Sequence, residues 1–223
     1  DKTALVRFDP RSLTRDTTRT KLVIQQIKIN DENICWYNLL NDPKLGSGGQ
    51  FEATKNTINK VEEVTTFGRL LSDRERREMR QKFSNIQFSG VSKWYFLPEN
   101  LVLPFSNNTI GFRFNAIETS KNFLMMYQYM LEGYDSDWTP LAHKTTASFS
   151  HLPEGTYTFK LKCRNHDGVW GMPIAFTFSV LPPWWRTWWM YAVYVGLAGS
   201  IFFGIIKVRE QKLKGEKLIL EET

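Results

Sequence analysis

Cysteine and histidine are scarce in this sequence. Its 223 residues include two cysteines, Cys35 and Cys163, and three histidines, His143, His151 and His166. Two cysteines are too few for a scaffold held by disulfides, and neither residue type follows the spacing of a zinc site. We therefore expect no metal ion. We also expect the two cysteines to be unbridged, with Cys163 as a small apolar core residue.

Residues that carry catalytic chemistry are not grouped either. The chain has no GxSxG nucleophile elbow, and the glycine-rich stretch 46–49 lacks the Lys-Ser/Thr pair of a P-loop. Asp135, Asp137 and Asp167 could bind Ca²⁺, but the spacing of an EF-hand is absent and aspartate favours turns. The sequence thus predicts no enzyme activity and no cofactor within this chain.

A long block of one charge is also missing. The formal net charge is +6, from 29 Lys and Arg against 23 Asp and Glu. Because the basic residues are interspersed with acidic ones, they form no basic stripe of the kind that binds nucleic acid. We expect no nucleic-acid partner.

One long run of residues contains no charged side chain. It extends from Trp188 to Ile206, and a membrane-spanning helix needs about 20 mostly apolar residues. A buried core helix is the alternative, but soluble helices of this length usually keep a polar face. Four tryptophans gather at one end, as in an interfacial aromatic belt: Trp184, Trp185, Trp188 and Trp189. The sequence predicts a transmembrane helix over residues 184–206.

The basic residues around this run predict its orientation. Before it, only Arg186 lies within about 15 residues, the window over which the positive-inside rule is counted. After it come five basic residues: Lys207, Arg209, Lys212, Lys214 and Lys217. We therefore expect residues 207–223 to be cytoplasmic, as the start of a signalling helix, and residues 1–183 to be periplasmic.

The preceding part of the chain alternates apolar and polar residues with period two, the pattern of half-buried strands. Five stretches show it: Lys21–Ile29, Thr109–Ile117, Met125–Glu132, Thr156–Arg164 and Ile174–Val180. Short alternating strands between turn signals predict an all-β sandwich of the immunoglobulin or fibronectin type. Tyr157 follows a Pro-Glu-Gly turn and is a candidate tyrosine corner. We expect both Tyr157 and Trp138 to be structural core aromatics without ligand contact.

Residues 38–98 interrupt this pattern. The segment Asn38–Lys60 is polar and glycine-containing, and we expect a flexible insertion there. A short helix is predicted from Ser72 to Phe83, because Ser72 and Glu75 form the sequence of a capping box. Its alternating charges indicate a solvated surface, and Met79 and Phe83 would anchor it at i and i+4.

The sequence from Tyr127 onward resembles a known family, the triple-tyrosine (Y_Y_Y) domain. Four segments carry the resemblance: Tyr127-Gln-Tyr129-Met-Leu131-Glu-Gly133-Tyr134-Asp-Ser-Asp-Trp138, Leu152-Pro-Glu-Gly155-Thr-Tyr157-Thr-Phe159, Asn165-His-Asp167-Gly168-Val-Trp170 and Leu181-Pro-Pro-Trp184-Trp185-Arg186-Thr-Trp188-Trp189. Any one segment would be weak, but together they are specific. Members of this family typically lie between a periplasmic β-propeller and a membrane helix in bacterial sensors, especially sensor and hybrid histidine kinases of Bacteroidetes.

The resemblance implies a domain arrangement. Residues 1–20 would be the tail of a preceding propeller or a linker, and residues 21–183 a Y_Y_Y-type sandwich with the insertion 38–98. The chain, which starts at Asp1, would be a fragment of a larger protein in the bacterial inner membrane. Its partners would be a propeller and a kinase of the same polypeptide, and a second copy in a homodimer. The residues expected to have structural or signalling roles are Tyr127, Tyr129, Tyr134, Trp138, Tyr157, Trp170, Pro182, Pro183, Trp184 and Trp185.

The function that we favour from the sequence is transmission of a ligand signal across the membrane. Gly196, Ser200 and Gly204 present small residues at helical spacing, which would let two membrane helices approach each other. The alternative is an anchored surface module for adhesion or carbohydrate binding. The sequence after Thr223 would distinguish the two, since only a sensor would continue into a kinase.

Overall fold

The computed structural model describes residues 20–40, 49–92, 94–117 and 124–221; it does not describe the side chains of residues 49–56, 208 and 210–221. The chain divides into two compact units, Asp1–Leu181 and Pro182–Thr223.

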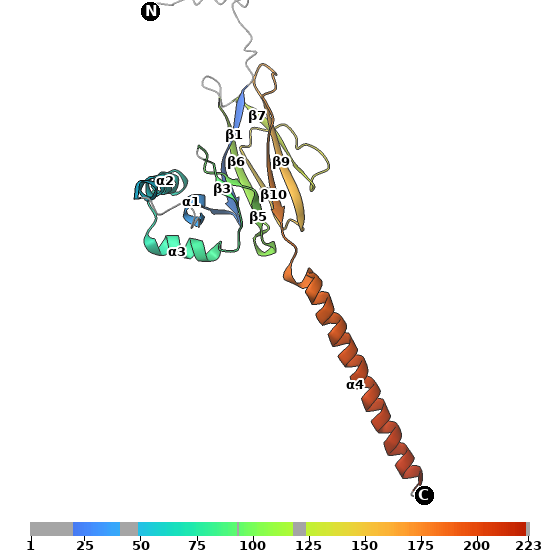
Figure 1. Cartoon of the computed structure of the whole chain (residues 1–223). Helices are drawn as coiled ribbons and strands as arrows, with labels where there is room; N and C mark the ends of the chain where they lie inside the picture. Colours follow the sequence, from blue (N-terminus) through green and yellow to red (C-terminus); the bar gives the residue numbers. More distant parts are fainter. Residues whose placement is uncertain (1–19, 41–48, 93, 118–123, 222–223) are drawn as a thin grey trace, which may run out of the picture. The chain divides into compact units, whose positions relative to one another are not determined.

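The first unit is a sandwich of two four-stranded sheets (Figure 1). One sheet has the order β2-β1-β6-β8, formed by Glu32–Asn33, Lys21–Ile29, Ile110–Ile117 and Thr146–Phe149. The other has the order β5-β10-β9-β7, formed by Leu101–Leu103, Ile174–Val180, Gly155–Arg164 and Met126–Glu132. Neighbouring strands are antiparallel except for β5 and β10, which are parallel. The predicted all-β sandwich and its five predicted strands are confirmed, whereas the sequence reading missed β8.

Aromatic rings from both sheets fill the space between them. Phe112 of β6 and Phe159 of β9 stack face to face, with ring centroids 4.1 Å apart. Along β9 every second residue is buried, from Tyr157 to Cys163, because successive side chains of a strand point to opposite faces. The alternation that was visible in the sequence therefore builds this core.

Strand β1 contains a β-bulge. Its pairing with β6 shifts between Ile24 and Gln26, so that one residue of β1 has no partner opposite. As a result, Ile24 and Ile27 are both buried, and Gln25 and Gln26 between them both face away from the core. Two consecutive glutamines are thus presented on one outer surface of the sheet.

The described part of the insertion is largely helical. Of the segment 38–60, which was expected to be a flexible insertion, residues 41–48 lie outside the described residues, and the residues from Gly49 onward form a helix instead. It contributes three helices on one side of the sandwich (Figure 1): α1 (Trp36–Leu39), α2 (Gly49–Phe67) and α3 (Asp73–Lys82). The short strands β3 (Gly90–Val91) and β4 (Pro98–Glu99) pair with each other. The capping box of Ser72 and Glu75 is confirmed, since each residue bonds the backbone N–H of the other. Phe83 is buried, and Met79 packs against the core as predicted.

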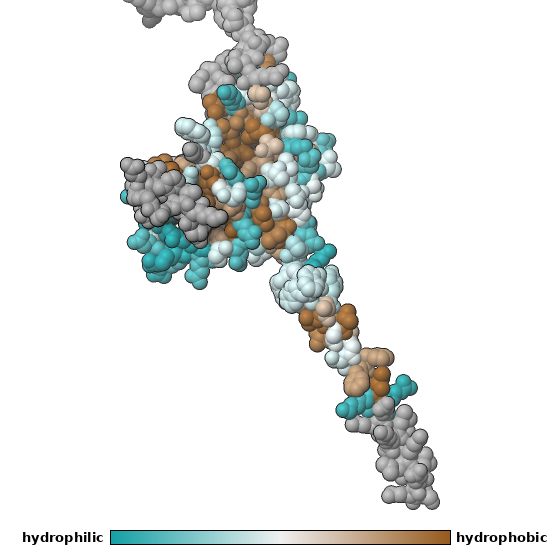
Figure 2. Space-filling view, in the orientation of Figure 1, coloured by the Kyte–Doolittle hydropathy of each residue, from teal (hydrophilic) through white to brown (hydrophobic). Residues whose placement is uncertain are grey.

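The second unit consists of a 3-10 turn, Trp184–Arg186, and the helix α4, Trp188–Glu221. The segment Trp188–Lys207 is long and apolar enough to cross a membrane, and apolar side chains cover much of this part of α4 (Figure 2). The predicted span of 184–206 starts too early, because the first residues form the separate 3-10 turn. Thr187, with φ of −79° and ψ of 148°, has an extended backbone and separates this turn from α4.

Candidate functional site

The first two tyrosines of the motif hold the two sheets together. The hydroxyl of Tyr127 on β7 donates to Asn115 Oδ1 (2.8 Å) and accepts from the backbone N–H of Ala116 (3.1 Å), both on β6. Burial raises the pKa of this tyrosine. Tyr129 is half-buried and packs its ring edge against Phe149, with centroids 6.1 Å apart. Both side chains therefore cross from one sheet to the other and face the core.

Tyr157 has the geometry of a tyrosine corner. Its hydroxyl donates to the carbonyl oxygen of Pro153, four residues upstream, at 2.8 Å, as this motif requires. The backbone of Gly133 lies against the same ring: a Cβ there would lie 3.2 Å from Tyr157 Cδ1, and the φ of Gly133 is +95°. This explains why glycine precedes Tyr134, whose own ring is more than half exposed.

The two tryptophans of the motif lie on the outer surface of the second sheet, which corrects the prediction of Trp138 as a core residue. The ammonium group of Lys162 lies 3.9 Å from the ring centroid of Trp138 and 4.9 Å from that of Trp170. Lys162 is on the outward face of β9, so the indoles that cover it remain outside the core. This is a cation–π cluster rather than hydrophobic packing.

Residues 182–187, which we call the collar, lie between β10 and α4 in the sequence and contain the remaining motif residues. Within the second unit, Pro182 is exposed and Pro183 is buried. The rings of Trp184 and Trp185 meet edge to face, with centroids 5.7 Å apart. Thr187 closes the 3-10 turn, because its hydroxyl donates to the carbonyl of Trp184.

The small residues of α4 leave an uncovered helix surface. A Cβ at Gly196 or Gly204 would meet no atom within 4 Å among the described residues. The hydroxyl of Ser200 bonds the carbonyl of Gly196 at 2.9 Å and is thus satisfied within its own helix. The structure brings these three positions to one face of α4 by their spacing of four.

Residues 119–181 match the family Y_Y_Y domain. The matched residues include strands β7, β8, β9 and β10. The motif tyrosines, the tyrosine corner and the Trp138–Lys162–Trp170 cluster all lie within them.

Other proteins contain similar segments. The chain is 32% identical over 124 residues to histidine kinase P4 of Formosa agariphila; the match covers 53% of this chain and 9% of that kinase. Among solved structures, it is similar to the extracellular domain of a protein described as a hybrid two component system from B. thetaiotaomicron, with 22% identity, 44% and 14% coverage, and a TM-score of 0.34. A second extracellular domain from B. thetaiotaomicron, described as a one component system, gives 15% identity, 75% and 16% coverage, and a TM-score of 0.42.

A buried pair of carboxylates on α2 organises the insertion beside the Y_Y_Y domain. Glu62 accepts the backbone N–H groups of Trp36 and Tyr37 at the start of α1, at 2.7 and 2.9 Å. Glu63 forms a bidentate ion pair with Arg76 of α3, at 2.7 and 2.9 Å. Burial raises the pKa of Glu62 to about 8, whereas hydrogen bonds from Arg76 lower that of Glu63 to about 2. Sequence reasoning missed both, since acidic residues in a polar segment suggest solvent exposure.

Gly171 is a second residue that the sequence reading missed. A Cβ at this position would lie 2.6 Å from Cys163 Sγ and 2.6 Å from the carbonyl oxygen of Thr20. Only glycine allows the chain after Trp170 to pass so close to β9. Cys35 and Cys163 are free and buried, and burial raises the pKa of the Cys163 thiol to about 11, so it is expected to be unreactive.

The described residues contain no group of three or more His, Cys, Asp or Glu side chains that could hold a metal ion. The Nδ1 atom of His143 contacts the carbonyl oxygen of Met125 at 2.8 Å, and His166 lies beside Asp167. Neither histidine is placed next to a serine or cysteine nucleophile in these contacts.

Proposed function

We propose that this chain is the membrane-proximal part of a two-component sensor. Its Y_Y_Y sandwich would pass a signal from an N-terminal ligand-binding propeller to a cytoplasmic kinase. The observation that carries the proposal is the order of elements along the chain. The Y_Y_Y domain ends at residue 181, and a helix able to cross a membrane starts at Trp188. The similarity to a histidine kinase supports this role.

The construction of the sandwich suits rigid-body transmission. Three features resist deformation within the sandwich: the stacked core rings, the hydrogen bonds of the Tyr127 hydroxyl and the tyrosine corner of Tyr157. The collar adds two prolines, each with a fixed φ, before the turn at Trp184. A displacement of β10 would therefore be passed to α4 rather than absorbed between them.

A flexible insertion in the collar tests this coupling. We expect Gly-Ser-Gly-Ser placed between Pro183 and Trp184 of the full-length receptor to abolish the ligand-dependent kinase output. Ligand binding and the amount of receptor in the membrane should not change, and both serve as controls. A receptor that still responds fully after this insertion would contradict rigid transmission through the collar.

The topology gives a second prediction. Since basic residues follow Ile206, we expect residues 1–183 to be periplasmic and residues 207–223 to be cytoplasmic. A phosphatase fused at Gln50, which is active only after export, should be active. A reporter that works only in the cytoplasm should be active when it is fused after Thr223. The reverse pattern of activities would rule out this orientation.

We further propose that the receptor is a homodimer in which two copies of α4 pair through Gly196, Ser200 and Gly204. Small residues four apart let helices approach closely in a membrane, and no described side chain covers these positions. Single cysteines scanned through 196–204, with Cys35 and Cys163 replaced by alanine, should crosslink periodically with maxima at these three sites. Uniformly low yields would exclude this interface.

A further inference from the structure

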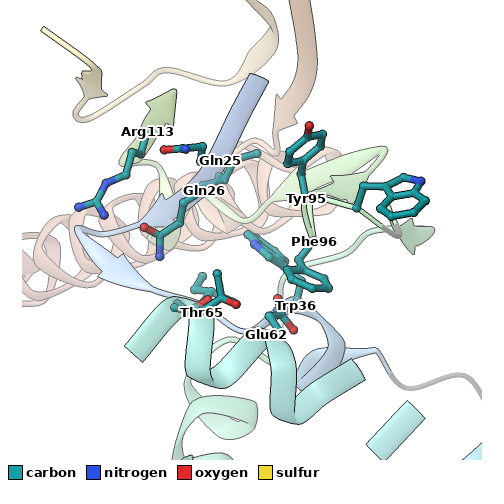
Figure 3. A pocket seen from close by; sticks show the side chains of 12 residues that line it. Gln25, Gln26, Trp36, Glu62, Thr65, Tyr95, Phe96 and Arg113 are labelled. Carbon is teal, nitrogen blue, oxygen red and sulfur yellow. The ribbon is translucent and has the colours of Figure 1, made fainter. Parts of the chain in front are cut away.

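A pocket of about 300 Å³ lies between the outer face of β1 and the helical insertion (Figure 3). Its volume is at the lower end of the range for small-molecule sites. The lining comes from β1, β6, α1, α2 and the turn between β3 and β4. None of the motif residues of the Y_Y_Y domain lines it, so the tyrosine motif does not account for it.

One side of the pocket is polar. The bulge of β1 presents both Gln25 and Gln26 here, and Arg113 of β6 pairs in register with Gln26. In Figure 3 the three side chains lie together on the side opposite Tyr95 and Phe96. In the part of the chain that the structure describes, their amide and guanidinium groups have no hydrogen-bond or ion-pair partner. Bulges often serve to direct side chains toward a functional site.

The other side of the pocket is aromatic and unusually exposed. Trp94 is 86% exposed and Tyr95 is 42% exposed, both in the turn after β3. Phe96 follows with a φ of +52°, a conformation that is strained for a bulky side chain. Its ring meets Tyr37 of α1 edge to face, with centroids 5.9 Å apart. Strained backbone and exposed large aromatic rings are both costly, and both are typical of binding surfaces.

The acidic residue of the pocket offers no free negative charge. Both carboxyl oxygens of Glu62 are bonded to the backbone N–H groups of Trp36 and Tyr37. Burial raises the pKa of Glu62 to about 8, which weakens the negative charge that this side chain presents. Apart from Glu62, Arg113 is the only residue among those lining the pocket that can carry a charge near neutral pH.

We propose that this pocket binds a small planar ring compound that carries one carboxylate. The ring would stack against the exposed rings of Tyr95 and Trp94, where aromatic pairs gain contact energy beyond that of area burial. The guanidinium of Arg113 matches a carboxylate in bidentate geometry, and the neighbouring glutamine amides can donate to the same group. The site would give the membrane-proximal unit an input of its own, and it does not depend on the proposed signalling role.

Three probes with the same ring and different head groups test the proposal: indole-3-acetate, its neutral amide and tryptamine. Binding is measured by calorimetry on the full chain in lipid nanodiscs, with empty nanodiscs as the blank. We expect the acid to bind at least about tenfold more tightly than the amide, since a hydrogen bond to a charged group contributes at least that factor. Tryptamine should bind most weakly.

Two variants locate the binding. Arg113→Gln should weaken binding of the acid by about tenfold and leave binding of the amide unchanged, because only the charged contact is lost. Trp94→Ala should weaken binding of both the acid and the amide. Arg164→Gln, on β9 of the other sheet, is the matched control and should change neither affinity. Equal affinity for all three head groups, an unaltered acid affinity in Arg113→Gln, or no saturable binding of the acid would each overturn the proposal.

Discussion

Replacing Phe159 by alanine is expected to lower the free energy of unfolding by about 4 kcal/mol, in the range found for buried aromatic truncations. Phe159 is fully buried and lies at the centre of the aromatic core. Its ring stacks on Phe112 at 4.1 Å and meets Phe149 at 6.1 Å. The alanine variant would lose these contacts and leave a cavity between the two sheets. Denaturant unfolding of the chain, followed by circular dichroism in the β region, measures the loss.

Tyr134→Ala is the matched control, because its ring also meets Phe149, at 6.3 Å, but is more than half exposed. We expect this substitution to lower the free energy of unfolding by about 1 kcal/mol, since it removes little buried apolar area. If Phe159→Ala were no more harmful than this control, the sandwich core would not be centred on Phe159. The rigid coupling that we propose would then lose its structural basis.

Replacing Arg76 by alanine is expected to destabilise the insertion by about 3 kcal/mol, because it leaves a buried carboxylate without its countercharge. The side chain of Glu63 is fully buried, and Arg76 is its cationic partner. Asn38 and the backbone N–H of Leu71 also donate to Glu63, so the same carboxylate holds α1 and the start of α3. The variant should loosen all these connections, which can be measured by hydrogen exchange of α1 and α3.

Arg74→Ala supplies the control on the same helix. Its ion pair with Glu78 is exposed, with 83% and 60% of the two side chains accessible, and exposed pairs contribute about 0.5 kcal/mol or less. A similar loss in both variants would contradict the assignment of Glu63 as the organising carboxylate.

The effect of Arg76→Ala should depend on pH. Hydrogen bonds from Arg76 lower the pKa of Glu63 from 4.5 to about 2 in the folded protein. A carboxyl with a lowered folded pKa stabilises the protein above its unfolded pKa, and this contribution disappears as the pH falls toward the folded value. The difference in free energy of unfolding between the native chain and Arg76→Ala should therefore be largest at pH 7. It should shrink between about pH 4.5 and pH 2.

The sandwich could be predicted because alternation is a local property of the sequence. In β9 the apolar residues from Tyr157 to Cys163 occupy every second position, and this alone fixes which face is buried. The tyrosine corner likewise follows from a turn and a tyrosine only four residues apart. Strand β8 was missed because its four residues, Thr146–Phe149, are too few to show a period.

The insertion and the outer surfaces could not be predicted in the same way. Helix α2 lies in polar sequence, and its stability depends on Glu62 and Glu63 reaching partners that are 8 to 26 residues away. Trp138 was expected in the core because an indole is apolar. Its position instead depends on Lys162, which is 24 residues later and offers a cation on the outward face of β9.

The sequence by itself thus determined the features that depend on neighbouring residues: the strands, the cap at Ser72, the uncharged run before Lys207 and the family motif. Tertiary structure decided whatever depends on which distant groups meet. It buried two carboxylates by supplying Arg76 and the N–H groups of α1, and it placed Gln25, Gln26 and Arg113 opposite an exposed aromatic turn. The physical reason is that hydrophobic periodicity acts along the chain, whereas a polar group is stable in the interior only where folding brings its partner.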